Sequence, residues 1–171
     1  MHSPLSLRSL AAADLPLVRS WMQDAPEAPR WSDAELARLV AVMPPSAPTG
    51  RLRHAWLAER VSPEGSDPHQ PVGFVVASGL HLPDSAECEL EFLFVAPDQR
   101  RSGVGCLLVN AVLAWAEEFG AQQVWLEVRP SNQAAQSLYR ACGFTATGSR
   151  PGYYADPRED ALLMGRQLRQ G

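Results

Sequence analysis

The chain has 171 residues, of which 46% are hydrophobic and 20% are charged. These values are typical of one soluble globular domain and exclude wholesale disorder. No apolar run approaches the roughly 20 residues that cross a bilayer, and the N-terminus lacks the basic and then apolar stretches of an export signal, so no membrane association is expected. A formal net charge of −4 disfavours direct nucleic-acid binding through general attraction to phosphate.

The cysteines and histidines argue against a disulfide framework and against a metal site. The three cysteines, Cys88, Cys106 and Cys142, are odd in number and contain no C-x-x-C pair. The four histidines are scattered and form no H-E-x-x-H motif. We therefore expect a cytoplasmic location and no metal, with Cys142 packed in the core.

Apolar periodicity and capping residues predict an alternation of helices and strands. In chain order the expected elements are a strand at Leu5–Leu7, a helix from Asp14 to about Met22, a helix from Ser32 or Asp33 to about Val42, strands at His54–Arg60, Val72–Leu80 and Cys88–Val95, a long helix between Gly103 and Gly120, a strand at Gln123–Val128, a helix at Asn132–Cys142, and strands at Phe144–Thr147 and Ala161–Leu168. This order predicts an α/β fold with a mixed sheet.

Two proline-rich stretches, near 43–50 and 62–71, interrupt this pattern and are predicted to be loops. The second separates two strand-like runs and is too long for a tight turn, so we interpret it as an extended hairpin loop. Neither stretch requires a domain boundary, and 1–171 is predicted to be a single domain.

A glycine-containing segment, Arg100–Gly105, lies between a strand and the start of the long helix. Unpaired N–H groups and the helix dipole attract anions at such a position. The segment lacks the Gly-Lys-Ser/Thr of a Walker loop, and Leu108 stands where a dinucleotide fingerprint has its third glycine. These residues alone leave open either a phosphate cradle or a plain strand-to-helix turn.

The run from Val95 to Gly105, VAPDQRRSGVG, resembles the strand end and R/Q-x-x-G-x-G/A loop of the GNAT acetyltransferases. Further segments resemble the RimI-type ribosomal-protein-alanine N-acetyltransferases: WLEVRPSNQAA from Trp125, Leu138-Tyr139 before Gly143-Phe144, and Tyr153-Tyr154 with the later Glu-Asp-Ala. The resemblance implies a mixed, largely antiparallel central sheet flanked by helices, and acetyl-CoA as the acetyl donor.

The expected acetyl-CoA site combines the strand end with the loop, because backbone donors and a helix N-terminus converge there. Its predicted residues are Leu93, Phe94, Val95, Arg101, Ser102, Gly103, Val104, Gly105, Cys106 and Asn132. Asn132 also stands at an expected helix N-cap, and capping by itself would account for it.

Acetyl transfer to an amine requires a base for the amine and an acid for the departing thiolate. Glu127 lies in an otherwise apolar strand, where burial can raise the proton affinity of a carboxylate; it could equally be an outward-facing partner of an arginine. Resemblance to the RimI-type enzymes implies the base role for Glu127. Glu91 is the alternative: a two-residue period places it with Glu89, Leu93 and Val95 on one face, and resemblance to other GNAT enzymes implies a role toward the attacking amine for a Glu at this strand position. Solvated edge carboxylates would give the same pattern.

The resemblance also implies that Tyr139 is the acid, although a helical tyrosine is more often a core residue with a paired hydroxyl. Tyr153 and Tyr154, near Arg150, lie on a Gly/Pro-interrupted segment predicted to reach over the acceptor.

The expected acceptor is a protein or peptide N-terminus, such as that of a small-subunit ribosomal protein. A small-molecule amine, or a non-catalytic acyl-CoA-binding role, are the alternatives.

Overall fold

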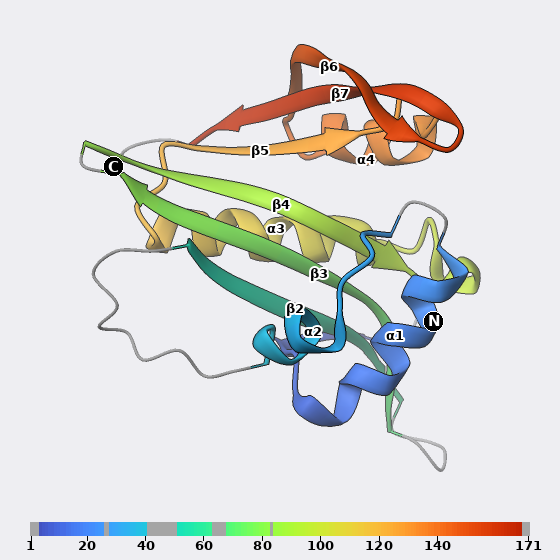
Figure 1. Ribbon diagram of the computed structural model, residues 1–171. Coiled ribbons are helices and arrows are strands. Elements are labelled where there is room, and N and C mark those ends of the chain that lie inside the picture. The colour runs from blue at the N-terminus through green and yellow to red at the C-terminus, as the bar shows by residue number, and fades with distance from the viewer. Residues whose placement is uncertain (1–3, 26–27, 41–50, 63–67, 83, 169–171) are drawn as a thin grey trace.

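The structure is a computed structural model that describes residues 4–25, 28–40, 51–62, 68–82 and 84–168 (Figure 1). Its helices and strands are β1 (Leu5–Ser9), α1 (Leu15–Asp24), α2 (Asp33–Arg38), β2 (Arg51–Val61), β3 (His69–Leu82), β4 (Ser85–Val95), α3 (Val104–Glu118), β5 (Gln123–Val128), α4 (Gln133–Ala141), β6 (Thr145–Ala155) and β7 (Arg158–Gln167), with 3₁₀ turns at Ala12–Asp14 and Pro97–Gln99.

The described strands form one sheet in the order β1-β2-β3-β4-β5-β7-β6, in which every neighbouring pair is antiparallel except β4 and β5. A parallel pair needs a crossover, and α3 supplies it. The pairing of β4 with β5 extends only from Glu87↔Gln123 to Glu89↔Trp125. Beyond these residues the two strands diverge, and the sheet opens between them (Figure 1).

Helices cover both faces of the sheet: α3 and α4 lie on one face, and α1 and α2 on the other (Figure 1). The α3 face buries Leu108, Val112 and Ala116 completely. The other face buries Val18 of α1 and Leu36 of α2 against Phe74 of β3. Each fully buried large aliphatic side chain contributes about 1.5–3 kcal/mol to folding, so the two layers fix the sheet between them.

Local signals placed several elements correctly. The strand β5 has the predicted bounds, and α3 begins directly after Gly103. Ser32 caps α2 through a reciprocal capping box with Glu35. The helix ends earlier than predicted, at Arg38, and Val42 lies outside the described residues.

The predicted loop at 62–71 is wrong at its C-terminal end, because β3 already begins at His69 and pairs with Val61 of β2. Residues 63–67 and the other proline-rich stretch, 43–50, lie outside the described part of the chain. Long antiparallel pairing with β2 extends β3 beyond its apolar segment.

The segment carrying Tyr153 and Tyr154 is part of strand β6 rather than an irregular loop. The strand lies at the edge of the sheet and pairs with β7 through two register shifts, one of them between Arg150 and Tyr154. Pro151 and Gly152 fall within that shift, where the missing N–H of a proline costs no ladder hydrogen bond. Glycine and proline therefore mark an irregularity inside a strand here.

The predicted common face for Glu89, Glu91, Leu93 and Val95 is wrong because β4 contains a bulge. The register with β3 passes from Ala77↔Leu90 to Val76↔Phe92, which leaves Glu91 without an opposite residue. An inserted residue reverses the side-chain alternation beyond it. Leu93 and Val95 accordingly pack with the core on the α3 face, whereas Phe92 packs with the core under α1 and α2.

Among the helices described, none is long and apolar enough to cross a membrane.

Candidate active site

The divergence of β4 and β5 and the N-terminus of α3 lie at the same end of the sheet. After Val95, the chain forms the 3₁₀ turn Pro97–Gln99 and then the loop that leads into α3. The predicted acetyl-CoA residues Leu93, Phe94 and Val95 lie in the part of β4 that β5 does not pair. The structure thus places the predicted strand end next to the predicted loop.

Left-handed backbone conformations shape this loop. Arg101 has φ = 61° and Gly103, the N-cap of α3, has φ = 89°. The N–H groups of Val104, Gly105 and Cys106 begin the helix, so they have no carbonyl partner within it. A Cβ built on Gly103 would meet no atom of the described residues within 4 Å. The loop therefore presents free donors and open space, which fits an anionic pyrophosphate.

The neighbouring residues hold α3 against α4. A Cβ on Gly105 would lie 2.8 Å from a methyl carbon of Leu138, so this glycine permits close helix contact.

Cys142 is buried, as predicted, and burial together with the nearby Cys106 raises the pKa of its thiol to about 11. Asn132 caps α4, because its Oδ1 accepts a hydrogen bond of 3.0 Å from the Ala135 N–H.

Arg60 of β2 braces the loop, a contact the sequence analysis missed. Its Nε donates to Gln99 Oε1 at 2.9 Å and its Nη2 to Ser102 Oγ at 3.2 Å, while Ser102 Oγ donates to the Gln99 carbonyl at 2.5 Å. No local sequence pattern identifies Arg60, since it lies about 40 residues from the loop.

Glu127 lies on β5 with its side chain only 10% exposed, and two groups bind it. Arg150 Nη1 donates to Glu127 Oε1 at 2.8 Å, and the Arg150 side chain is 60% exposed. The Tyr153 hydroxyl also hydrogen-bonds to Glu127, and this contact, followed by burial, raises the Tyr153 pKa to about 12. Glu127 is therefore both nearly buried and paired with an arginine, so the two interpretations of its strand position are not exclusive.

Glu91 and Glu89 of β4 are bound by arginines of β2. Arg53 Nη2 forms an ion pair with Glu91, and Arg51 Nη2 forms one with Glu89. The intervening strand β3 carries the small residue Ser78, whose Oγ accepts from Arg51 Nε at 2.8 Å. Burial raises the pKa of Glu89, and the nearby charges of Glu91 and Glu127 add to the rise.

The two glutamates of β4 and the two arginines of β2 line a hollow of about 350 Å³. This volume is within the usual range of about 300–1,000 Å³ for ligand pockets. Its lining residues are Pro29, Trp31, Glu35, Arg51, Arg53, Glu89, Glu91 and Tyr153. Tyr153 connects the hollow to Glu127. The arginines were missed by the sequence analysis, although their two-residue spacing on one strand matches that of the glutamates on another.

The remaining predicted residues lie apart from this hollow. Tyr139 is buried in the core on the α3 face, with its ring 5.9 Å from that of Phe144. Glu127 lies on the opposite face, because its neighbours Leu126 and Val128 point into that core. Tyr154 stacks on the Arg129 guanidinium at 4.0 Å. Glu127 and Tyr139 therefore lie on opposite faces of the sheet, and Glu127 lies in the part of β5 that does not pair with β4.

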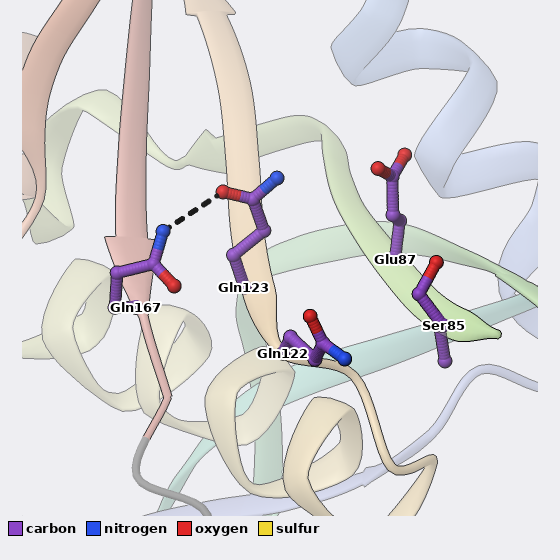
Figure 2. Close-up of a pocket in the computed structure, with 6 residues that line it drawn as sticks. Ser85, Glu87, Gln122, Gln123 and Gln167 are labelled. Carbon is purple, nitrogen blue, oxygen red and sulfur yellow. Dashed lines mark hydrogen bonds between the residues drawn. The ribbon is translucent and has the colours of Figure 1, made fainter.

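A second hollow of about 260 Å³ lies at the other end of the sheet, where β4 and β5 begin (Figure 2). Ser85, Glu87, Gln122, Gln123 and Gln167 line it, and Gln167 Nε2 donates to Gln123 Oε1 at 3.1 Å. It is far along β4 from the start of α3. In neither hollow do the described residues form a group of three or more side chains suited to binding a metal.

Comparison with known proteins relates this geometry to acetyltransferases. The family model described as "Acetyltransferase (GNAT) family" matches residues 18–144. The ribosomal protein bS18-alanine N-acetyltransferase of Escherichia coli K12 is 41% identical over 80 residues, which cover 46% of this chain and 54% of that protein. The matched part of the chain thus spans about half the length of this curated relative.

Solved structures extend the similarity over the whole fold. The crystal structure of the Escherichia coli ribosomal-protein-S18-alanine N-acetyltransferase matches with a TM-score of 0.70 at 28% identity, and the match covers 98% of this chain and 96% of that one. Arabidopsis thaliana NAA60 in complex with acetyl-CoA shares the fold, with a TM-score of 0.81 at 18% identity over 96% of this chain and all of that one. The chain therefore belongs to the GNAT family of acetyltransferases, and within it the chain is similar to the RimI-type enzymes.

Proposed function

We propose that the protein transfers the acetyl group of acetyl-CoA to the N-terminal α-amine of a protein or peptide, with an N-terminal alanine, as in a small-subunit ribosomal protein, as the expected acceptor. The observation that carries the proposal is the position of Glu127. Through Tyr153 it borders a polar hollow, and it lies in the part of β5 that β4 does not pair, on the side where β4 leads into the loop before α3.

The loop before α3 is proposed to bind the pyrophosphate of acetyl-CoA. The first N–H groups of the helix donate to the phosphate oxygens, and the positive end of the helix dipole adds to the attraction. The bound cosubstrate supplies an activated thioester. Arg60 keeps the loop in its binding conformation through Gln99 and Ser102.

Glu127 is proposed as the base that takes the proton from the attacking amine. Its ion-pair partner is Arg150, whose side chain is 60% exposed and can return to water when it leaves the carboxylate. An incoming amine can therefore displace Arg150. Glu91 is held by both Arg53 and Arg51, which leaves its oxygens less available.

Tyr139 is proposed as the acid. The nitrogen forms its bond to the acetyl carbon while the carbon–sulfur bond breaks, the amine proton passes to Glu127, and the Tyr139 hydroxyl gives its proton to the sulfur. This division of labour uses both faces of the sheet, with the acceptor entering from the face of α1 and α2 and the thioester from that of α3 and α4.

A peptide N-terminus fits the charges of the hollow. The four carboxylates in and beside it are Glu35, Glu89, Glu91 and Glu127, and the three guanidinium groups are Arg51, Arg53 and Arg150. One excess negative charge favours a cationic amine. The similarity to the bacterial ribosomal protein bS18-alanine N-acetyltransferase supports the same acceptor class.

Mass spectrometry of two acceptor panels tests this proposal. The purified protein, given acetyl-CoA, should acetylate peptides with an N-terminal alanine faster than a panel of small-molecule amines at equal concentration. Faster acetylation of the small amines would assign the enzyme to the other acceptor class. Binding of acetyl-CoA without transfer to either panel would indicate an acyl-CoA-binding role.

Substitution of Gly103 tests the acetyl-CoA site. We expect Gly103→Val to weaken acetyl-CoA binding at least roughly tenfold, about 1.4 kcal/mol, in isothermal titration calorimetry, because the side chain enters the space over the helix N-terminus. Gly120→Val is the matched control, since Gly120 follows the other end of α3 with φ = 80° and equally open surroundings.

Both substitutions place a β-branched residue at positive φ and should lower the melting temperature alike. Only Gly103→Val should alter acetyl-CoA binding. Equal affinity for acetyl-CoA in the two variants would contradict the proposed site.

A further inference from the structure

Arg53, which lines the hollow of about 350 Å³ described above, carries an unsatisfied hydrogen-bond donor. Its Nε atom is buried, and no described residue accepts its hydrogen. Buried donors are almost always satisfied in folded proteins, because leaving one unsatisfied destabilises the fold. An unsatisfied donor in the wall of a binding hollow therefore points to an acceptor atom supplied by a ligand.

The surroundings of Arg53 hold its guanidinium in one place. Nη2 is paired with Glu91, and Cζ of the guanidinium lies 4.7 Å from the centroid of the Trp31 ring. Trp31 is itself held edge-on against Phe92, with the ring centroids 6.2 Å apart. A fixed guanidinium can select a ligand atom by position as well as by charge.

The charges around Arg53 favour a neutral ligand oxygen over an anion. Glu91 already compensates its positive charge, and Glu89 of the same strand lines the hollow with it. A ligand carboxylate would be repelled by both glutamates, whereas an amide carbonyl would not. A peptide N-terminus carries such a carbonyl directly beside the α-amine.

We propose that Arg53 is a specificity-determining residue whose Nε–H donates to the carbonyl oxygen of the acceptor's first peptide bond. The enzyme then prefers an α-amine next to a carbonyl over an amine that lacks one. The assignment rests on the proposed function, because it requires the amine to be bound near Glu127 in the hollow that Tyr153 and Arg53 share.

A pair of acceptors tests the assignment: a tetrapeptide with N-terminal alanine, and the same molecule with its first peptide bond replaced by an (E)-alkene. The alkene keeps the shape and removes the carbonyl oxygen. The wild-type enzyme should show a kcat/KM about 10- to 100-fold higher for the peptide, the range expected for a hydrogen bond from a charged donor. This comparison requires no variant.

Arg53→Lys keeps a cation for Glu91 but removes the Nε–H at this position, so the preference for the peptide should fall to within about threefold. Arg51→Lys is the matched control on the same strand, because the Nε of Arg51 is already satisfied by Ser78. It should retain the wild-type preference, whatever its effect on the overall rate.

Three results would overturn the assignment. The first is a wild-type enzyme that acetylates both acceptors equally well. The second is an Arg53→Lys enzyme that is slower on both acceptors by the same factor, which would make Arg53 a structural brace. The third, acetyl-CoA binding with no acetylation of alanine peptides, would remove the proposed function as well, so the two failures are distinguishable.

Discussion

Glu127→Gln should lower kcat roughly 100-fold or more in a steady-state assay with an alanine-terminated peptide, the usual scale for a positioned proton-transfer group. The amide can still accept hydrogen bonds from Arg150 and Tyr153, which both bind the carboxylate in the wild-type protein. The variant therefore keeps the shape of the site and loses only the proposed base. Its affinity for acetyl-CoA should be unchanged.

Glu91→Gln is the matched control for this substitution. The two carboxylates are almost equally buried, at 10% and 13% exposed, and each is bound by an arginine. We expect Glu91→Gln to reduce kcat by less than tenfold. If Glu91→Gln were the crippled enzyme and Glu127→Gln nearly normal, Glu91 would be the base, and a small-molecule amine would become the better acceptor.

The pH profile separates the loss of a base from a loss of geometry. A free α-amine has a pKa of about 7.7–8.0, so below this range the amine arrives protonated and needs the base. The rate ratio of wild type to Glu127→Gln should therefore be largest below pH 7.5 and decrease as the pH rises above 8. The Tyr153 pKa of about 12 keeps this phenol protonated throughout the assay range. A ratio that does not change with pH would indicate a positional role.

Tyr139→Phe should also lower kcat roughly 100-fold, with little change in the Kd for acetyl-CoA, because only the hydroxyl proposed to protonate the departing sulfur is lost. The ring is buried and packs near Phe144, and phenylalanine retains that packing. Single-turnover kinetics and calorimetry measure the two quantities independently. A loss of stability without a loss of rate would show that the hydroxyl has a structural role instead.

Elements whose start or bounds depend on local chemistry could be predicted from the sequence. Ser32 and Glu35 have the spacing of a capping box, and their reciprocal contacts start α2. Gly103 tolerates the positive φ found at the N-cap of α3. The apolar run of β5 gives its bounds, and the residues around Gly103 and Glu127 indicate the acetyltransferase family before any contact is known. Each of these signals involves residues a few positions apart, so a single pass along the chain finds them.

The assembly of the site depends on contacts between distant strands and could not be predicted from the sequence. The bulge at Glu91 depends on register with β3, and the ion pair of Glu91 joins residues 38 positions apart in the sequence. Glu127 and Tyr139 lie on opposite faces of the sheet because Leu126 and Val128, the neighbours of Glu127 on β5, point into the core that holds Tyr139. Register and pairing between distant strands follow from the packing of the whole sheet between its helices. A local sequence pattern therefore does not predict them.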